Sequence, residues 1–309
     1  MAYFSVVVPV YNKAGALDNC INSLINQTYS DFEVIFVNDG STDNSVEEIK
    51  EKTGLDKRFR LVEHEKNMSV STARFTGMED ACGEYLFFMD SDDAIETNSF
   101  EKIKESLEKN PVDILRYNHI EEPSKKVKPL ATSDNMIRDI LLGTIPPAVW
   151  RSCYSKKVYK GACSEGEKFY SNMGEDMYLA TVLFSQANTI GALDEPLYHY
   201  DTSSGMSSTV AKPSIEKFQR DKKNIDEVAT HLRKYAKSRD DIQSEWVETC
   251  IRQQYLFIIV QQLKKYAADE EMVKSYLEIF ATDEHKELVE YATRVLNKLK
   301  EQILSDNSN

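Results

Sequence analysis

Short hydrophobic runs alternate with segments of helical hydrophobic spacing through the first half of the chain. The runs Phe4–Val10 and Phe32–Val37 are nearly continuous and rich in β-branched residues, which is typical of strands buried on both faces. Between them, the segment Leu17–Asn26 places apolar residues on one side of a predicted helix. Two further runs, Phe59–Glu63 and Tyr85–Met89, continue the pattern. The alternation predicts an α/β protein whose mainly parallel sheet carries helices on both faces.

The pattern becomes almost purely helical toward the C-terminus. Two short strands, Thr189–Leu193 and Leu197–Tyr200, are expected on either side of a proline. Residues 214–305 contain almost no glycine or proline and predict several amphipathic helices. We therefore predict one domain over residues 1–211 and a helical region over residues 212–309. Further helices are expected over residues 43–52, 69–82, 97–109, 134–142 and 174–186.

The net charge restricts the class of ligand. The 309 residues carry a formal net charge of −13. Broad nucleic-acid binding needs a positive surface that displaces counterions, so we expect no nucleic-acid partner. The basic clusters Lys125–Lys128 and Lys156–Lys160 are interpreted as solvated loops, and Glu121–Thr132 as an exposed polar loop.

Cysteine usage and hydropathy indicate the compartment. The cysteines are odd in number and widely spaced, which favours a reducing compartment without a disulfide framework or a zinc site. They are Cys20, Cys82, Cys153, Cys163 and Cys250. The sequence enters its first strand directly and holds no apolar run of transmembrane length, so neither a signal peptide nor a membrane span is expected. We expect a cytoplasmic protein, and contact with the inner face of a membrane stays open.

Carboxylates crowd the end of the fourth predicted strand, where Tyr85–Met89 runs directly into Asp90-Ser91-Asp92-Asp93. Carboxylates this close repel one another unless a cation lies among them, and oxygen ligands favour Mg²⁺ or Mn²⁺. Asp39 follows another buried strand. In open parallel sheets, ligands bind beyond the carboxyl ends of the strands. The pattern therefore predicts a metal-assisted phosphate site at this edge.

Five blocks in this order together resemble the family 2 glycosyltransferases of the GT-A fold, a Rossmann-like fold that binds nucleotide-sugars. The blocks are Val8-Pro9-Val10-Tyr11-Asn12, Asp39-Gly40-Ser41-Thr42-Asp43, Ala73-Arg74, Asp90-Ser91-Asp92-Asp93 and Gly174-Glu175-Asp176. The similarity covers about residues 3–205. It is greatest to bacterial members that build capsules, O-antigens and other surface polysaccharides.

The resemblance implies a nucleotide-sugar donor, a divalent metal and inversion at the anomeric carbon. By resemblance, Pro9, Val10 and Tyr11 form a wall of the nucleoside pocket. Asp39 is expected to bind the base, most often uracil, and Arg74 to lie near the phosphates.

The acidic blocks take the remaining roles that the resemblance implies. Asp92 is expected to bind the metal, and Asp90 to contact the ribose or the water shell of the metal. Asp176 is the expected catalytic base, with Glu175 beside it. A base that removes the acceptor proton and a cation that stabilises the departing diphosphate are the groups that inverting transfer requires.

Three positions depart from the family pattern, namely Ser69 for a glycine, Phe75 for an asparagine and Asp201 for an arginine. The Asp201 substitution puts a phosphate contact from that position in doubt. The segment 202–208 still resembles a flexible lid. His199 could ligate the metal or pack in its strand, and both interpretations stay open.

We therefore expect an inverting, Mn²⁺- or Mg²⁺-dependent hexosyl- or hexosaminyltransferase that uses a UDP-sugar. The acceptor would be a glycan or a polyprenyl-linked glycan, and a homodimer stays open. One alternative is a catalytically silent nucleotide-sugar-binding or scaffold protein. Another is a sugar nucleotidyltransferase, although the segment Tyr11–Gly15 lacks the glycine-rich phosphate loop usual in that class.

Overall fold

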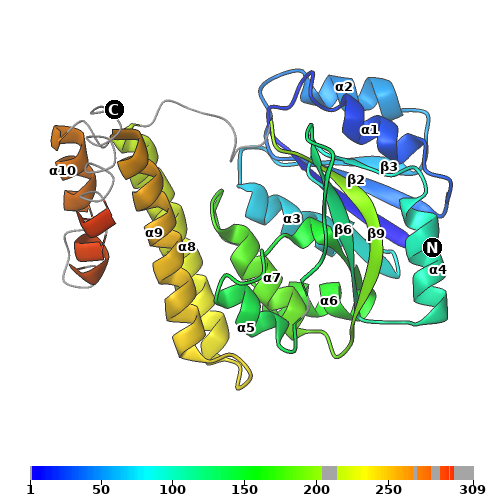
Figure 1. Ribbon diagram of the computed structural model, residues 1–309. Helices are drawn as coiled ribbons and strands as arrows, with labels where there is room; N and C mark the ends of the chain where they lie inside the picture. The colour runs from blue at the N-terminus through cyan, green and yellow to red at the C-terminus, as the bar shows by residue number, and fades with distance from the viewer. Residues whose placement is uncertain are drawn as a thin grey trace. The chain divides into compact units, whose positions relative to one another are not determined.

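The computed structural model describes residues 2–131, 133–203, 214–266, 270–279, 286–291 and 293–295 (Figure 1). By the density of their internal contacts, the residues form two compact units. The first unit comprises Met1–Ile140 and Thr144–Thr209, and the second comprises Leu141–Gly143 and Val210–Asn309.

Four parallel strands form one half of the sheet in the first unit. They lie in the order β3 (Phe59–Glu63), β2 (Phe32–Asn38), β1 (Phe4–Val10) and β4 (Tyr85–Phe88). Every residue of β1 is buried, as the continuous apolar run predicts. This register brings the carboxyl ends of β1 and β2 side by side, since Val10 pairs with Asn38.

The other half of the sheet is mixed. From β4 it continues through β8 (Ser152–Ser155), β6 (Ile114–Glu122), β9 (Ile190–Asp201) and β5 (Ala94–Ile95). Within this half β6 and β9 pair in parallel, whereas β8 runs antiparallel to both β4 and β6. The predicted α/β class with a mainly parallel sheet is confirmed.

Three local predictions in this half were wrong. The two strands expected around Pro196 are one strand, β9, in which irregular register opposite Tyr117 and Asn118 accommodates the proline. The predicted loop Glu121–Thr132 contains a short strand, β7 (Lys126–Lys128), that pairs with β6. The lysine cluster expected to be a loop lies at the start of helix α6 (Lys156–Glu165).

Helices cover both faces of the sheet, as predicted (Figure 1). One face holds alternate residues of β1 such as Val6 and Val8, in a core shared with α1 (Asp18–Ile25) and α4 (Ser99–Lys109). The opposite face is covered in part by α3 (Val70–Asp80), which packs on β1 and β2. The remaining helices of this unit are α2 (Ser45–Thr53), α5 (Met136–Leu141), the 3₁₀ helix η1 (Val149–Arg151) and α7 (Glu175–Ser185).

A glycine sets the close approach of α3 to the sheet. A Cβ atom added to Gly77 would lie 2.3 Å from Cγ1 of Val7, so any larger residue would push the helix outward. The position of α3 matters because this helix carries Arg74.

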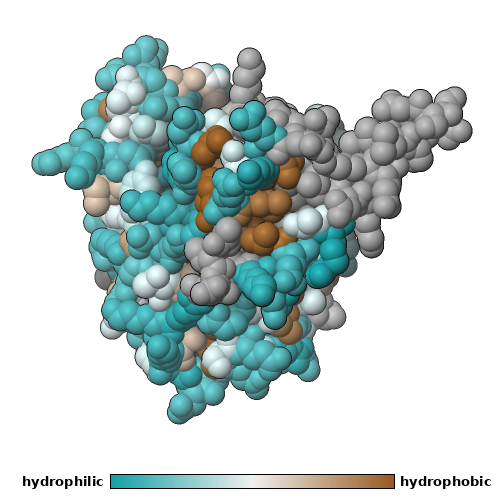
Figure 2. Space-filling model, turned by 90° about the vertical axis from the view of Figure 1, so that its left-hand side faces the viewer, coloured by the Kyte–Doolittle hydropathy of each residue, from teal (hydrophilic) through white to brown (hydrophobic). Residues whose placement is uncertain are grey.

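The second unit is helical, as the sequence pattern predicts. Its helices are α8 (Ile215–Lys237), α9 (Ser244–Tyr266) and α10 (Glu270–Ile279). α8 and α9 bury apolar residues such as Leu232 and Ile258, and Arg233 forms an ion pair with Glu248 at 2.6 Å. Across the described residues, no helix has both the length and the apolar character that crossing a membrane requires. Figure 2 shows hydrophobic residues gathered on one face of the molecule between hydrophilic ones.

Candidate active site

The carboxyl ends of β1, β2 and β4 meet at one edge of the sheet. The amide of Asp39 donates to the carbonyl of Val10 at 2.8 Å, and the amide of Met89 donates to the carbonyl of Val7 at 3.0 Å. Tyr11, just beyond β1, is 44% exposed. The predicted nucleoside residues therefore lie together where parallel sheets bind ligands.

Asp39 is buried and held in a fixed orientation. Its Oδ1 atom accepts from the amide of Met68 at 2.8 Å and lies 2.7 Å from Nδ1 of His64. The other ring nitrogen of His64 lies 3.1 Å from the hydroxyl of Thr76 on α3. Because an ionised carboxylate only accepts hydrogen bonds, Nδ1 of His64 is the donor in this pair.

The turn after Asp39 requires a glycine. Gly40 has a φ of +71°, and a Cβ atom there would lie 2.5 Å from the backbone of Lys66. The close approach brings the segment that carries His64 and Met68 against Asp39. His64 was not among the predicted site residues, and only its position just beyond β3 could have indicated it.

Arg74 joins three carboxylates from two distant parts of the chain, the end of β4 and the start of α7. Its Nη2 atom donates to Oδ1 of Asp90 at 2.9 Å. Its Nη1 atom donates to Oε1 of Glu175 at 3.1 Å and to Oδ1 of Asp176 at 2.5 Å. The Arg74 side chain is only 4% exposed, whereas those of Asp90 and Asp176 are 28% and 30% exposed. The carboxylates of Asp90 and Asp176 thus face solvent over a buried cation.

Burial and mutual repulsion dominate the protonation of this cluster. Burial and the neighbouring Asp176 raise the pKa of Glu175 to about 7, although Arg74 opposes the shift. Burial also raises the pKa of Asp176, against the opposing effect of Arg74. Burial alone would lower the pKa of Arg74, but Asp176, Asp90 and Glu175 outweigh it and raise that pKa.

Asp92 lies against a lysine. Its Oδ2 atom is 2.6 Å from Nζ of Lys13, and the Asp92 side chain is 11% exposed. The Lys13 amide donates to the hydroxyl of Ser45 at 2.8 Å, and the neighbouring Asn12 binds the backbone of Thr42. The loop after β1 is therefore fixed to the turn after β2, and this attachment positions Lys13.

Asp93 connects the acidic block to the end of β9. Its Oδ2 atom accepts from the hydroxyl of Tyr198 at 2.6 Å, and its Oδ1 atom accepts from the amide of Asp201 at 2.8 Å. The same hydroxyl accepts from the amide of Asp90 at 3.1 Å. Asp93 therefore holds the strand that leads into the predicted lid, and no sequence signal separated it from its acidic neighbours.

Three further predictions concern His199, Ser69 and the lid segment 202–208. His199 lies between two carboxylates, with Nδ1 2.8 Å from Glu122 and Nε2 2.9 Å from Glu96, so both ring nitrogens are engaged. Ser69 keeps the left-handed backbone of the glycine that it replaces, with a φ of +85°. Residues 204–208 of the predicted lid lie outside the described residues.

Asp90 and Asp92 fit a divalent ion that takes most of its ligands from the phosphates of the substrate and from water. Among the described residues, no group of three or more His, Cys, Asp or Glu side chains could hold a metal. Asp92 and Asp90 offer hard carboxylate oxygens, and Mg²⁺ commonly takes one or two carboxylates and completes its shell with phosphates and water. Asp92 and Asp90 would therefore be the protein ligands.

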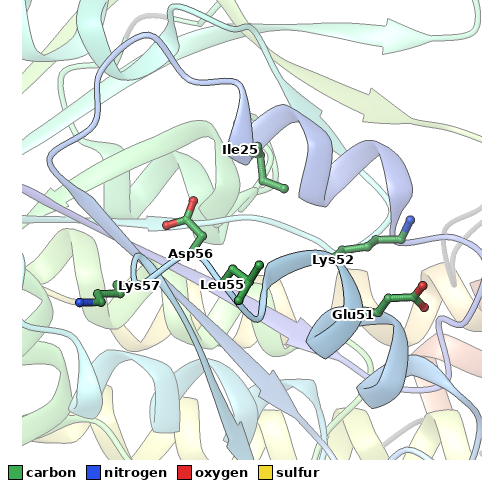
Figure 3. A pocket seen from close by; sticks show the side chains of 6 residues that line it. All are labelled: Ile25, Glu51, Lys52, Leu55, Asp56 and Lys57. Carbon is green, nitrogen blue, oxygen red and sulfur yellow. The ribbon is translucent and has the colours of Figure 1, made fainter.

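A surface pocket elsewhere does not belong to this site (Figure 3). It lies near the end of α1 and the segment after α2, before β3 begins, at the opposite edge of the sheet from Asp39. Its lining residues are Ile25, Glu51, Lys52, Leu55, Asp56 and Lys57.

Known proteins with similar sequences are glycosyltransferases. Residues 5–148 match the model of glycosyl transferase family 2. The chain is 30% identical over 228 residues to the uncharacterized glycosyltransferase EpsJ of Bacillus subtilis, covering 69% of this chain and 65% of EpsJ. It is 31% identical over 227 residues to glycosyltransferase GlyA of Streptococcus pneumoniae, covering 67% of this chain and 31% of GlyA. The matched region thus spans less than two thirds of each relative.

Solved structures share the fold at low identity. TarS of S. aureus in complex with UDP-GlcNAc matches with a TM-score of 0.65 and 20% identity, covering 91% of this chain and 80% of that one. Mannosyltransferase PcManGT from Pyrobaculum calidifontis, in complex with GDP-Man and Mn²⁺, matches with a TM-score of 0.52 and 15% identity, covering 98% and 87%. Residues 5–148 therefore belong to glycosyltransferase family 2. The fold is the GT-A fold that these solved structures share.

Proposed function

We propose that the protein is an inverting, metal-dependent enzyme that moves a sugar from a UDP-sugar to a hydroxyl of a glycan or lipid-linked glycan. The reaction would serve the synthesis of a bacterial surface polysaccharide. The observation that carries the proposal is the contact of buried Arg74 with Asp90 on one side and Asp176 on the other. The guanidinium group of Arg74 thereby lies between Asp90, on the proposed donor side of the site, and Asp176, on the proposed acceptor side.

On the donor side, Pro9, Val10 and Tyr11 would line the nucleoside pocket, and Asp39 would bind the base. The Oδ1 atom of Asp39 already accepts two hydrogen bonds, whereas Oδ2 has none from any described residue. A single free acceptor suits the one N–H donor on the pairing edge of uracil. Support also comes from the TarS structure, which holds UDP-GlcNAc.

The leaving diphosphate would lie beside Arg74, Asp90 and Asp92. A divalent ion held by Asp92 and Asp90, when bound, would neutralise the charge that develops on the leaving group. Arg74 would stabilise the same negative charge, because its contacts with Asp90, Glu175 and Asp176 already fix the orientation of its guanidinium group. The PcManGT structure, with GDP-Man and Mn²⁺, supports this arrangement.

On the acceptor side, Asp176 would remove the proton of the attacking hydroxyl. It lies at the start of α7 and is partly exposed, as a base that meets a substrate must be. Its raised pKa increases its basicity, and the contact with Arg74 fixes its orientation. Attack from this side, opposite the leaving diphosphate, would invert the anomeric carbon. Glu175 would position Arg74.

The first test is calorimetric titration with UDP, GDP, CDP and dTDP, each with and without Mn²⁺. We expect Mn²⁺-dependent binding of UDP to the native protein and its loss in Asp92→Ala. Asp31→Ala, which removes an exposed carboxylate before β2, is the matched control and should bind UDP normally. A correctly folded native protein that binds no nucleotide would contradict the donor site.

Product analysis separates the alternatives. Release of UDP from a UDP-sugar supports transfer, whereas release of pyrophosphate from UTP and a sugar phosphate would indicate a nucleotidyltransferase. Binding of UDP without turnover on any acceptor or on water would indicate a catalytically silent binding protein.

A further inference from the structure

Two arginines are buried in the first unit without an acidic partner. Arg116 on β6 is 6% exposed, and Arg151 in η1 is 7% exposed. Within the described residues, no aspartate or glutamate oxygen lies within 4.0 Å of either guanidinium group, since every ion pair of an arginine in this unit involves another residue. Buried arginines are normally paired, because an uncompensated buried charge is strongly destabilising.

Backbone carbonyls satisfy only part of these two groups. Nη1 of Arg116 donates to the carbonyl of Ala131 at 3.0 Å and lies 3.4 Å from the sulfur of Met136. Nη2 of Arg151 donates to the carbonyls of Lys128 and Pro129 at 3.2 Å and 3.1 Å. Carbonyl oxygens accept hydrogen bonds but do not neutralise the two positive charges.

Several side-chain nitrogens of this cluster lack a hydrogen-bond partner among the described residues. Nε of Arg151 is sealed from solvent without a hydrogen-bond partner, and so is Nδ1 of His119. In the described part of the chain, Nη1 of Arg151 and both Nε and Nη2 of Arg116 also lack a partner, yet they are not among the sealed atoms. Arg116 pairs with Ser152, the residue after Arg151, so these donors come from neighbouring positions of the sheet.

The charges of this cluster act on one another. Burial and the neighbouring Arg116 lower the pKa of Arg151 to about 10. Burial and the neighbouring Arg151 lower the pKa of His119 to about 4. An anion placed among the three would reverse both shifts and remove the repulsion, because it would favour each charged form.

Arg151 lies on an element that contacts the helix of the proposed base. The 3₁₀ helix η1, which contains Arg151, packs against α7, whose first residues are Glu175 and Asp176. Tyr154 on the neighbouring strand β8 packs edge-on against Phe184 of α7, with ring centroids 6.3 Å apart. Next to Arg151, Trp150 stacks between Tyr198 and Tyr200, with ring centroids 4.5 Å and 5.0 Å away.

We propose that Arg116 and Arg151, with His119 beside them, form an anion-binding subsite that takes a phosphate group of the acceptor. This inference rests on the proposed function, because it assigns the subsite to the acceptor of the same reaction. Two guanidinium groups match the charge of a phosphate and offer forked donors to its oxygens. The acceptor class is thus a phosphorylated sugar rather than a neutral glycan.

The test compares phosphate binding in native protein, Arg151→Met and Arg116→Met. Each protein is saturated with UDP and Mg²⁺, so that the donor site is filled, and the shift in melting temperature is measured with inorganic phosphate against chloride at equal ionic strength. We expect phosphate to stabilise the native protein and each Met variant to bind phosphate at least tenfold more weakly. Arg138→Met, which removes a partly exposed arginine paired with Asp134 and Asp139, should respond as the native protein does.

A merely structural role gives a different result. If Arg151 only caps the loop carbonyls, Arg151→Met will melt at a lower temperature and keep the native response to phosphate. Under our inference, the Met variants lose the response and melt no lower than the native protein without phosphate, because an unpaired buried charge is gone. If Arg151→Met does not fold, Arg151→Lys is the substitute. It keeps the positive charge but loses the paired donors of the guanidinium group, so it should bind phosphate with intermediate affinity.

A second arm identifies the source of the phosphate by titrating hexose 1-phosphates, the free hexoses and inorganic phosphate. Tighter binding of a hexose 1-phosphate than of inorganic phosphate, lost in Arg151→Met, supports an acceptor subsite. Equal binding of all phosphates, with no gain from the sugar, would overturn the assignment to the acceptor. Failure of the native protein to bind UDP would instead count against the proposed function itself.

Discussion

His64 should control which nucleotide the protein accepts, and two substitutions separate its two hydrogen bonds. His64→Asn keeps a donor near the position of Nδ1, which faces Asp39, and loses the contact with Thr76. His64→Gln instead places its amide near the position of Nε2, so it keeps the Thr76 side and loses the Asp39 side. The comparison therefore isolates the 2.7 Å contact with Asp39 from general effects of removing the ring.

The magnitude follows from the bonds that hold Asp39. A hydrogen bond to a charged group contributes about 1.5–3 kcal/mol. The amide of Met68 still restrains Oδ1 at 2.8 Å after the substitution, so only part of the orientation is lost. We expect His64→Gln to weaken UDP binding by about 1.4 kcal/mol, or roughly tenfold, and His64→Asn by about threefold or less.

Calorimetry with UDP and GDP in the presence of Mn²⁺ measures both affinity and base preference. Without His64 the Asp39 carboxylate can offer both oxygens, and guanine presents two adjacent donors, so His64→Gln should also reduce the preference for UDP over GDP. Equal UDP affinity and unchanged base preference in native protein and His64→Gln would refute the reasoning. Matching melting temperatures would confirm that the variants remain folded.

Three further predictions concern the charged groups around Arg74. Arg74→Met should lower the free energy of unfolding by about 3–5 kcal/mol in urea titrations, because three carboxylates lose their shared cation; a loss below 1 kcal/mol would contradict this. Asp176→Asn should reduce the rate of sugar transfer by about 10²–10⁴-fold while UDP affinity in calorimetry stays within about threefold of native, since the proposed base acts on the acceptor. In metal-free buffer, the folded state should retain a proton on Glu175 between the unfolded pKa of 4.5 and the folded pKa of about 7. Stability should therefore fall as the pH rises through this window, and urea titrations should show a smaller fall for Glu175→Gln, whereas an unchanged slope would argue against the raised pKa.

The strands that carry the proposed donor site could be predicted because each is a long apolar run with a clear end. Phe4–Val10 and Phe32–Asn38 are buried along nearly their whole length, and the polar residue after each run marks the carboxyl edge. The short strand Ser152–Ser155 gave no comparable signal, since it has four residues and two of them are serines. It is a strand only because β4 and β6 flank it and supply partners on both sides.

Contacts between distant segments could not be obtained from local pattern. Arg74 and Asp176 are 102 positions apart, and Asp93 and Tyr198 are 105 positions apart. The resemblance to a family placed Arg74 and Asp176 in one site, but it did not indicate the contact between Asp93 and Tyr198. Ser69 illustrates the same limit, because its hydroxyl accepts from the amide of Ser171 at 3.1 Å and so ties the start of α3 to the segment before α7. The replacement of a glycine by serine therefore adds a contact that its position in the sequence does not indicate.

The charge of the site explains why nucleotide and cation should bind together. Lys13 and Arg74 each already contact a carboxylate, at Asp92 and Asp90, so neither is an unpaired cation waiting for a diphosphate. In a protein of net charge −13, adding a diphosphate to these carboxylates without a further cation would place more negative charge beside Asp92 and Asp90. A divalent ion that arrives with the diphosphate would remove this penalty and free Lys13 to contact phosphate instead of Asp92. We therefore expect nucleotide binding to be strongest with the metal and weak without it, because of the charge balance as well as metal ligation.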